Sequence, residues 1–161
     1  KIIIEGKQFG ISLCGMFALD TMRMESGYVH WGHDISPEEN QYEAGLQFTI
    51  SYKKNIDFIG KKALLKIKEN KQKKKLIMLA LENSQPGNPL LLHDEPIYLE
   101  NKIVGRTTSG NYSFNFNKNL AYGYVEQNIK NDKEIYIEVE KKKYKANILS
   151  APLNKKNIKT I

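Results

Sequence analysis

The amino-acid sequence predicts an α+β protein in two parts, with helical segments in residues 1–70 and a small antiparallel β-barrel or sandwich in residues 71–161. In the first part, apolar residues recur at spacings of three and four, which is typical of amphipathic helices. In the second part, short runs with period-two alternation are separated by turn residues, which is typical of β-strands. Four lysines within residues 71–75 separate the two patterns, and we place the domain boundary there.

The first part opens with a β-prone run at residues 1–5, for which we expect a short strand. Residues 12–25 have the spacing of a helix. Gly27 is expected to end this helix, because glycine takes up the left-handed backbone conformation without steric cost. The apolar face expected on the helix consists of Gly15, Ala18, Leu19 and Met22.

Three further elements are expected before the boundary. Ser36 is followed by a proline and two glutamates, which is typical of a helix N-cap and predicts a short helix or turn near residues 37–43. Residues 45–52 alternate between apolar and polar or small side chains, which predicts a strand with one buried face. Residues 60–70 predict a second amphipathic helix. Its inward face is expected to be Ala63, Leu64 and Ile67.

The second part is predicted to consist of short strands. A Pro-Gly-Asn-Pro break at residues 86–89 follows the first of them. In the aromatic run at residues 112–116, alternation at period two favours packing in the barrel core over a stacking surface for nucleic-acid bases. Hairpins are expected around residues 100–102 and 141–143. The expected strands are residues 76–81, 97–99, 103–105, 112–116, 120–125, 135–139 and 144–148.

The charge of the chain is +7 in 161 residues, and lysines that neutralise phosphates can drive nucleic-acid binding. However, 23 of the 25 basic residues are Lys, so the excess favours a solvated lysine surface, and we expect no nucleic-acid partner. The two arginines, Arg23 and Arg106, are therefore candidates for planar, bidentate hydrogen bonding.

The single cysteine, Cys14, excludes an internal disulfide and a cysteine-based zinc site, and it fits a reducing compartment. Its place in an apolar run favours inert packing. No apolar run approaches the roughly 18 residues of a membrane span, and the N-terminus lacks the layout of a signal peptide. Because the sequence opens without Met in what reads as a strand, we expect a fragment of a longer polypeptide.

Glu25 is the sharpest candidate for a binding site. Residues two apart on a helix are separated by about 200°, so Arg23 and Glu25 cannot share a face. Arg23 is expected to pair with Asp20 or to reach another segment, which leaves Glu25 free at the helix end. An unpaired carboxylate there suits a ligand with adjacent N–H donors, although a solvated or locally capped glutamate remains the alternative.

His30, His33 and Asp34 have a spacing that resembles a metal site, but no further spaced ligand accompanies them. We therefore expect no metal. A polar bend in which one histidine stacks on Trp31 is the favoured interpretation.

Four motifs in register resemble a known family. They are FALDTMRMESGYVHWGHDIS (17–36), YEAGLQF (42–48), DFIGKKALL (57–65) and IVGRTTSGNYSFNFNKNLAYGYV (103–125). Together they are similar to the folate-binding C-terminal part of dimethylglycine and sarcosine dehydrogenases and, more distantly, to the aminomethyltransferase (T-protein) of the glycine cleavage system. The resemblance covers nearly all of residues 10–153, and the Trp31-Gly32 and DFIGK features favour the dehydrogenase branch.

The resemblance implies a fold and a ligand. Residues 1–70 would be the C-terminal part of a folate-binding α+β domain, and residues 71–161 a Greek-key β-barrel. Glu25 would match the family's folate-binding glutamate, since one carboxylate can accept both the ring N–H and the amino group of a reduced pterin. The side chains expected to line the same tetrahydrofolate pocket are Met24, Ser26, Phe17, where relatives often have Tyr, and Tyr112.

The resemblance also implies an activity, namely oxidative N-demethylation by FAD with transfer of the one-carbon unit to tetrahydrofolate. The flavin site and the catalytic aspartate would lie upstream, so we expect no catalytic residue here and an inactive isolated chain. The expected partners are a methylated amine or aminomethyl donor and the missing N-terminal domains, without a membrane. The expected location is the cytoplasm, or the mitochondrial matrix in a eukaryote. The alternatives are an aminomethyltransferase without flavin, a relative with another small ligand, and a non-enzymatic basic barrel that binds RNA.

Overall fold

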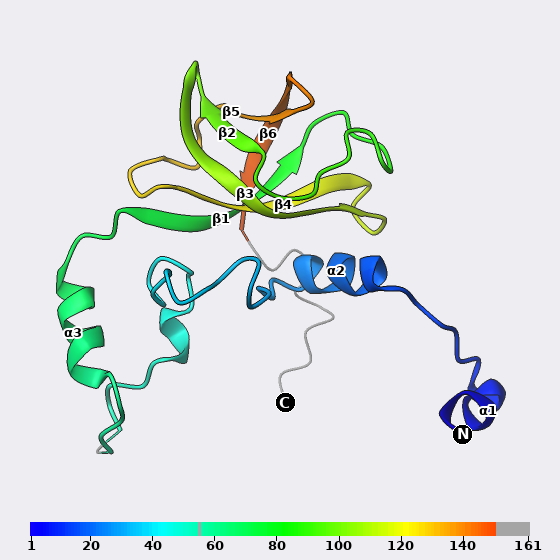
Figure 1. The fold of residues 1–161 in the computed structure, drawn as a ribbon, viewed down its shortest axis with the longest axis horizontal. Coiled ribbons are helices and arrows are strands. Elements are labelled where there is room, and N and C mark those ends of the chain that lie inside the picture. Colours follow the sequence, from blue (N-terminus) through cyan, green and yellow to red (C-terminus); the bar gives the residue numbers. More distant parts are fainter. Residues whose placement is uncertain (55, 151–161) are drawn as a thin grey trace.

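The protein consists of a β-barrel with a helical N-terminal region along one side (Figure 1). The computed structural model describes residues 1–54 and 56–150, and residues 151–161, which end the expected second part, lie outside the described residues. The helices are α1 (Ile2–Gly6), α2 (Met16–Glu25) and α3 (Lys61–Glu69), with short 3₁₀ helices η1 (Lys7–Phe9) and η2 (Gln47–Thr49). The strands are β1 (Lys74–Leu81), β2 (Pro96–Leu99), β3 (Lys102–Ser113), β4 (Lys118–Glu126), β5 (Ile135–Val139) and β6 (Lys142–Leu149).

The six strands of the described region form a closed antiparallel barrel in the order β1-β4-β3-β2-β5-β6, with β6 pairing back onto β1. Strands β2, β3 and β4 form a meander, and β1 lies beside β4, so the barrel contains a Greek key. Glu140 and Lys141 both have positive φ in the two-residue turn between β5 and β6, as a type I′ hairpin requires. The expected hairpins around residues 100–102 and 141–143 are confirmed, and the structure decides for a barrel over a sandwich.

The interior of the barrel holds the main hydrophobic core. Inward side chains alternate along the strands, as in β5, where every second residue is buried. Strand β1 is buried at five consecutive positions, because its outward side chains are also covered. The buried core residues are Ile77, Leu79, Leu81, Leu91, Ile97, Val104, Ala121, Val125, Ile129, Ile135, Ile137, Val139 and Ala146.

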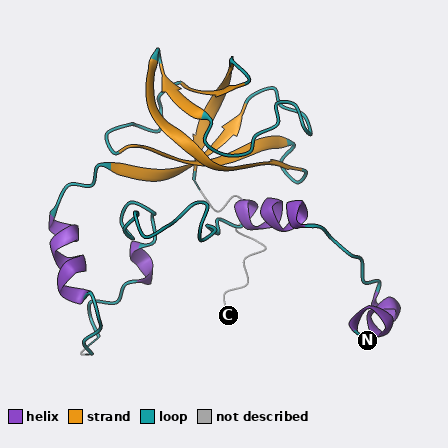
Figure 2. Ribbon diagram, viewed as in Figure 1, coloured by secondary structure: helices purple, strands orange, loops and turns teal. Residues whose placement is uncertain are grey.

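A second, smaller cluster covers the outer surface of β1 and β4. Met24 of α2 packs there against Met78, Ala80, Leu120 and Tyr122. Figure 2 shows the helices on one side of the barrel, with α2 directly beside its wall, while α1 and α3 lie farther out. Helix α2 is therefore the helix that couples the first part of the chain to the barrel.

Two strands expected in the first part are absent from the structure. Residues 2–6 form helix α1, and Glu5 N–H donates to the Lys1 carbonyl oxygen at 3.0 Å. In residues 45–52, η2 replaces the strand, and Thr49 N–H donates to the Leu46 carbonyl oxygen at 3.0 Å. A strand needs a neighbour for its backbone hydrogen bonds, and within the described residues neither segment has one, so both make local bonds.

The helix predictions hold in position but not in the orientation of α2. Gly15 is extended and precedes the first turn, so α2 begins four residues later than expected, and Gly27 ends it with a φ of 79°. The predicted apolar face is wrong, since Leu19 and Met22 are 50% and 55% exposed whereas Met24 is buried. Helix α3 forms as expected, with Leu64 and Ile67 partly buried and Ala63 exposed.

The structure of the loops and turns tests three local predictions. The turn after Ser36 is confirmed, and the Ser36 hydroxyl accepts from the Glu38 N–H at 3.1 Å. The aromatic run 112–116 is not in the core, because β3 ends at Ser113 and Phe114 lies 70% exposed in the following turn. Cys14 precedes α2 and is exposed, so its predicted packing is wrong. Within the described residues, no helix is both long and apolar enough to cross a membrane.

Candidate functional site

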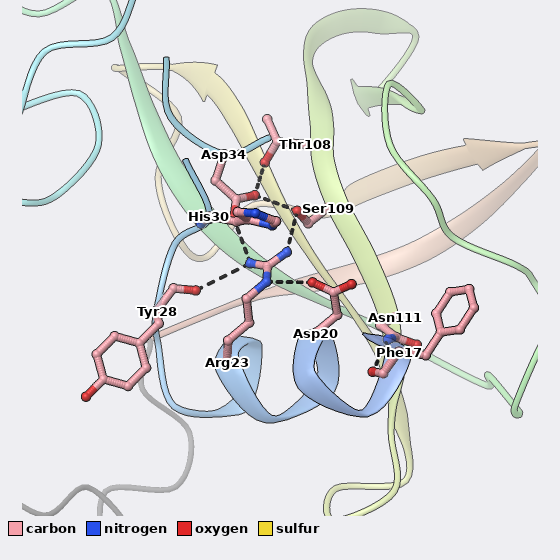
Figure 3. Close-up of polar contacts among 9 residues, drawn as sticks. All are labelled: Phe17, Asp20, Arg23, Tyr28, His30, Asp34, Thr108, Ser109 and Asn111. Atoms are coloured by element: carbon pink, nitrogen blue, oxygen red, sulfur yellow. Dashed lines mark hydrogen bonds and ion pairs between the residues drawn. The ribbon is translucent and has the colours of Figure 1, made fainter. Parts of the chain in front are cut away.

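Arg23 lies at the junction of α2, the following loop and β3 (Figure 3). Its Nε donates to Asp20 at 2.7 Å, as expected from the sequence. The other arms of the guanidinium reach Asp34 Oδ2 at 2.7 Å and Ser109 Oγ at 2.9 Å. Nη1 also donates to the Tyr28 carbonyl oxygen at 3.4 Å. The planar fork of Arg23 therefore joins three segments, which an ammonium on a flexible stem would not reproduce.

Asp34 is the acceptor at the centre of this junction and is 1% exposed. Its Oδ2 accepts from Arg23 and from the His30 backbone N–H at 2.8 Å. Its Oδ1 accepts from Thr108 Oγ1 at 2.6 Å and from Ser109 Oγ at 2.7 Å. These donors match the acceptor capacity of a carboxylate and offset the cost of burying its charge. We refer to Asp20, Arg23, Asp34, Thr108 and Ser109 as the polar clasp.

Glu25 contacts the end of the β3–β4 hairpin and is 4% exposed. Its Oε1 accepts from the Ser113 hydroxyl, and its Oε2 accepts from Asn115 Nδ2 at 2.6 Å. The expectation of an unpaired carboxylate is therefore wrong. The donors lie about 90 residues along the chain, so spacing within the helix could not reveal them. A contact of Glu25 with folate stays a prediction.

The residues on either side of Glu25 differ in their surroundings. Met24 is 1% exposed and is enclosed by the outer barrel cluster. Ser26 is the C-cap of α2 and lines a cavity of about 670 Å³ together with Tyr28 and Tyr122. Of these two residues, only Ser26 borders a space that a ligand can enter within this chain.

Phe17 and Tyr112 lie on opposite sides of the contact between the N-terminal half of α2 and β3. The Asn111 side-chain N–H₂ donates to the Phe17 carbonyl oxygen at 2.9 Å, and Thr21 Oγ1 donates to the Tyr112 carbonyl oxygen at 3.1 Å. Phe17 is 73% exposed, and the ring of Tyr112 packs edge-on against that of Phe114 at 5.1 Å. An exposed aromatic surface of this kind can pack on a flat heterocycle.

The histidines of the bend contact each other and not Trp31. The ring centroids of His30 and His33 are 4.6 Å apart, while Trp31 is 66% exposed. Within the described residues, no group of three or more His, Cys, Asp or Glu side chains is placed to hold a metal ion.

A cavity of about 840 Å³ lies between the 32–39 loop and the outer surface of the barrel. Most of its charges are paired: Lys74 with Glu39 at 2.6 Å and Arg106 with Asp94 at 2.5 Å. Arg106 is 67% exposed and makes one short contact, so its expected bidentate role is wrong. Hydrogen bonding by His93 lowers the pKa of Asp94, against the effect of burial, and Arg106 lowers it further.

Two buried tyrosine hydroxyls, those of Tyr122 and Tyr124, have no hydrogen-bond partner among the described residues. Burial raises the pKa of both phenols, and the negative charges of Asp34 and, for Tyr124, Glu39 raise it further. Both side chains are therefore neutral and belong to the barrel wall behind the clasp.

Sequence reasoning found Arg23 and Asp20 but missed the other members of the polar clasp. The predicted structural bend includes Asp34, and Thr108 and Ser109 lie between the predicted strands 103–105 and 112–116, within the motif at residues 103–125. The sequence contains one signal for Asp34. An arginine in a lysine-rich chain suggests a further carboxylate partner beside Asp20, and Asp34 is the first carboxylate after the helix.

The described strands form a closed Greek-key barrel, and a buried arginine–aspartate network attaches α2 to it. These features define an α+β protein that is built around a β-barrel. Residues 74–155 match the family model described as "Glycine cleavage T-protein C-terminal barrel domain". Residues 1–54 match the model described as "GCVT N-terminal domain". The chain belongs to the glycine cleavage T-protein superfamily, as the resemblance of its motifs predicted.

The sequence is similar to those of enzymes from two groups. The chain is 36% identical to dimethylglycine dehydrogenase of Mus musculus over 157 residues, which are 95% of this chain and 17% of that protein. It is 38% identical to an aminomethyltransferase of Symbiobacterium thermophilum over 120 residues, or 74% of this chain and 31% of that protein. The chain thus spans less than a third of either relative.

A solved structure shares the fold. The aminomethyltransferase T of the glycine cleavage system from Bartonella henselae matches with a TM-score of 0.77 at 24% identity. The match covers 88% of this chain and 39% of that one. It confirms the predicted α+β fold with its C-terminal barrel.

Proposed function

We propose that this chain is part of a folate-dependent one-carbon enzyme and forms one wall of its tetrahydrofolate pocket. The observation that carries the proposal is the match of one family model to residues 1–54 and of a second to residues 74–155 of the same chain. The two matched regions are in contact where α2 packs on β3 and β4. The division into residues 1–70, the end of the folate-binding domain, and residues 71–161, the barrel domain, is part of the proposal.

We assign the parent enzyme to the dehydrogenase branch, in which FAD oxidises an N-methyl amine and tetrahydrofolate receives the one-carbon unit. Trp31-Gly32 and the DFIGK motif support this branch. The identities of 36% and 38% to the two groups of relatives are too close to separate them. An aminomethyltransferase without flavin is therefore the second candidate.

The residues of this chain fit a pterin to different degrees. Phe17, which is 73% exposed, and the partly buried Tyr112 are the aromatic side chains proposed to pack on the flat ring system. Each oxygen of Glu25 accepts one hydrogen bond and can accept a second, so capacity for two pterin N–H groups remains. A ligand cannot reach the carboxylate of Glu25 directly, because this residue is buried. We propose that the exposed Asn115 moves aside, so that Oε2 of Glu25 becomes accessible to the ligand. Ser26 would border the ligand from the helix end, whereas Met24, which is enclosed by the outer barrel cluster, would reach it only after a movement of its neighbours.

The rest of the parent enzyme is proposed to cover the exposed apolar side chains of the N-terminal region. Leu13, Met16 and Phe17 are 80%, 68% and 73% exposed, and such a row rarely stays in water. The flavin and the catalytic aspartate would belong to the covering domains, so the isolated chain is expected to be inactive. The parent would act in the cytoplasm, or in the mitochondrial matrix of a eukaryote.

The test is a titration of tetrahydrofolate into the full-length protein that contains this chain. Glu25→Gln should weaken binding about tenfold, the effect of losing a charge-assisted hydrogen bond of roughly 1.5 kcal/mol. Asn115→Ala should leave binding equal or tighter, since it removes the competing donor. Binding unchanged in Glu25→Gln would refute the role of Glu25, and absence of binding in the wild type would refute the proposed function.

A second assay separates the two branches. The full-length protein should show the visible absorbance of a flavin, and dimethylglycine or sarcosine should bleach it anaerobically. A colourless protein that forms methylenetetrahydrofolate from an aminomethyl donor would assign it to the transferase branch instead.

A further inference from the structure

The apolar contacts of α2 are too few to fix its rotation about its own axis. Met24 is its one fully buried apolar side chain, whereas Met16, Leu19 and Met22 are at least half exposed. A methionine is flexible and fills differently shaped spaces, so it holds a helix against a wall without selecting one rotational setting. Another set of contacts must therefore determine which residues α2 presents to the barrel and which it presents outward.

The polar clasp supplies these contacts and favours one rotational setting of α2. Arg23 is 13% exposed at its side chain, and Asp34 is fully buried at its side chain, so their 2.7 Å contact lies out of water. Rotating α2 would leave a buried charge without its partner, which is costly in a low-dielectric site. Ser109 bonds both members of the pair, donating to Asp34 and accepting from Arg23, which ties the helix to one position on β3.

Asp34 is the common point of these contacts. It receives hydrogen bonds from α2 through Arg23, from the loop through His30, and from β3 through Thr108. The other carboxylate of the clasp, Asp20, is on α2 itself and cannot fix the helix relative to the barrel. Thr21 and Glu25 also bond to β3 and the turn after it, but Asp34 is the buried charge outside the helix to which α2 is tied by an ion pair.

We propose that Asp34 is a positioning residue: through Arg23 it sets the rotation of α2, and thereby the placement of Glu25 and Phe17 toward the ligand. Glu25 follows Arg23 by two residues, so a turn of the helix that releases Arg23 also pulls Glu25 away from Ser113. The ligand part of this inference rests on the proposed function; the orientation part does not.

The first experiment is hydrogen–deuterium exchange on the full-length protein, comparing wild type, Asp34→Asn and the control Glu39→Gln. Glu39 also forms a short ion pair, with Lys74, but contacts no residue of α2 in the structure. Asp34→Asn should speed exchange in residues 16–35 and leave β5 and β6 unchanged, whereas Glu39→Gln should leave α2 protected. Equal exchange in all three proteins, or an increase spread evenly over the barrel, would overturn the proposal.

The second experiment titrates tetrahydrofolate into the same proteins and adds a matched pair at one donor. Thr108→Val removes the hydroxyl at nearly constant volume, and Thr108→Ser keeps it. Asp34→Asn should weaken binding about tenfold, Thr108→Val by less, and Thr108→Ser should restore wild-type affinity. Glu39→Gln should change affinity less than twofold, and the melting temperature of every variant is measured beside its affinity.

The outcomes distinguish the two claims. If the wild type binds no tetrahydrofolate, the proposed function fails, and exchange in α2 alone decides whether Asp34 sets its orientation. If the wild type binds and affinity falls only in proportion to melting temperature across all variants, Asp34 is merely structural and the positioning role is wrong.

Discussion

The barrel and the N-terminal region achieve order by different means. The barrel encloses a continuous apolar core between paired strands, whereas residues 1–70 contribute only Met24 and Ala44 to the fully buried apolar residues. The N-terminal region is held instead by polar contacts, chiefly the clasp between α2 and β3. Apolar burial is tolerant of small shifts, while buried ion pairs demand one geometry. The barrel therefore provides stability, and the clasp provides orientation.

The largest effect should come from the barrel core. In the 161-residue chain, Leu79→Ala should lower the free energy of unfolding by about 4 kcal/mol, because Leu79 is fully buried and its loss leaves a cavity. Leu19→Ala, at a half-exposed position of α2, should cost less than about 0.5 kcal/mol. Urea denaturation of both variants checks the contrast, and equal losses would mean that the N-terminal region has a core of its own.

The next effect should appear at the outer apolar cluster, to which both regions contribute side chains. Met24→Ala should cost about 2–3 kcal/mol because it empties the outer cluster around Tyr122. Met22→Ala, with the same chemistry at a 55% exposed site, should be nearly neutral. Thermal denaturation compares the pair, and a larger loss in Met22→Ala would reverse the orientation assigned to α2.

A smaller effect should follow from replacing the arginine fork. Arg23→Lys should cost about 1–2 kcal/mol, since an ammonium cannot satisfy Asp34 and Ser109 together. Arg106→Lys is the matched control, and its exposed pair with Asp94 should contribute almost nothing. If both substitutions leave the melting temperature unchanged, the clasp does not stabilise the junction.

The smallest effect should be a pH dependence at the loop that follows the clasp. Burial raises the pKa of Glu39, but hydrogen bonds from Lys74 and Ser36 outweigh it, so the pKa lies below its ordinary 4.5. A lowered folded-state pKa adds stability above pH 4.5, which is lost as the pH falls through the folded value. The difference in melting temperature between wild type and Glu39→Gln should therefore shrink as the pH is lowered below 4.5. A difference that stays constant would contradict the assigned ion pair.

The contrast between the barrel and the N-terminal region also explains which elements could be predicted from the sequence. Alternation along residues 135–139 and 144–148 located a hairpin correctly, because each strand has a neighbour that its side-chain pattern anticipates. Residues 1–5 and 45–52 carry a strand-like pattern but have no adjacent strand in the described structure, so local propensity misled. The side-chain pattern of a segment does not show whether a neighbouring strand is present to pair with it.

The candidate site divides in the same way. The pairing of Arg23 with Asp20 follows from helical spacing and is confirmed. Both donors to Glu25 and the two hydroxyl donors to Asp34 come from β3 and the turn after it, and no local pattern links positions so far apart. The folate-contacting roles of Glu25, Met24, Ser26, Phe17 and Tyr112 came from resemblance and stay predictions.

The central claim is that α2, held by the barrel, faces the folate pocket of a larger enzyme. A crystal structure of the full-length protein with bound 5-formyltetrahydrofolate tests it most directly. The account predicts a pterin packed beside Phe17, with its N–H groups directed at Glu25 and Asn115 displaced from Oε2. A ligand bound elsewhere, with Glu25 still held by Ser113 and Asn115, would contradict it.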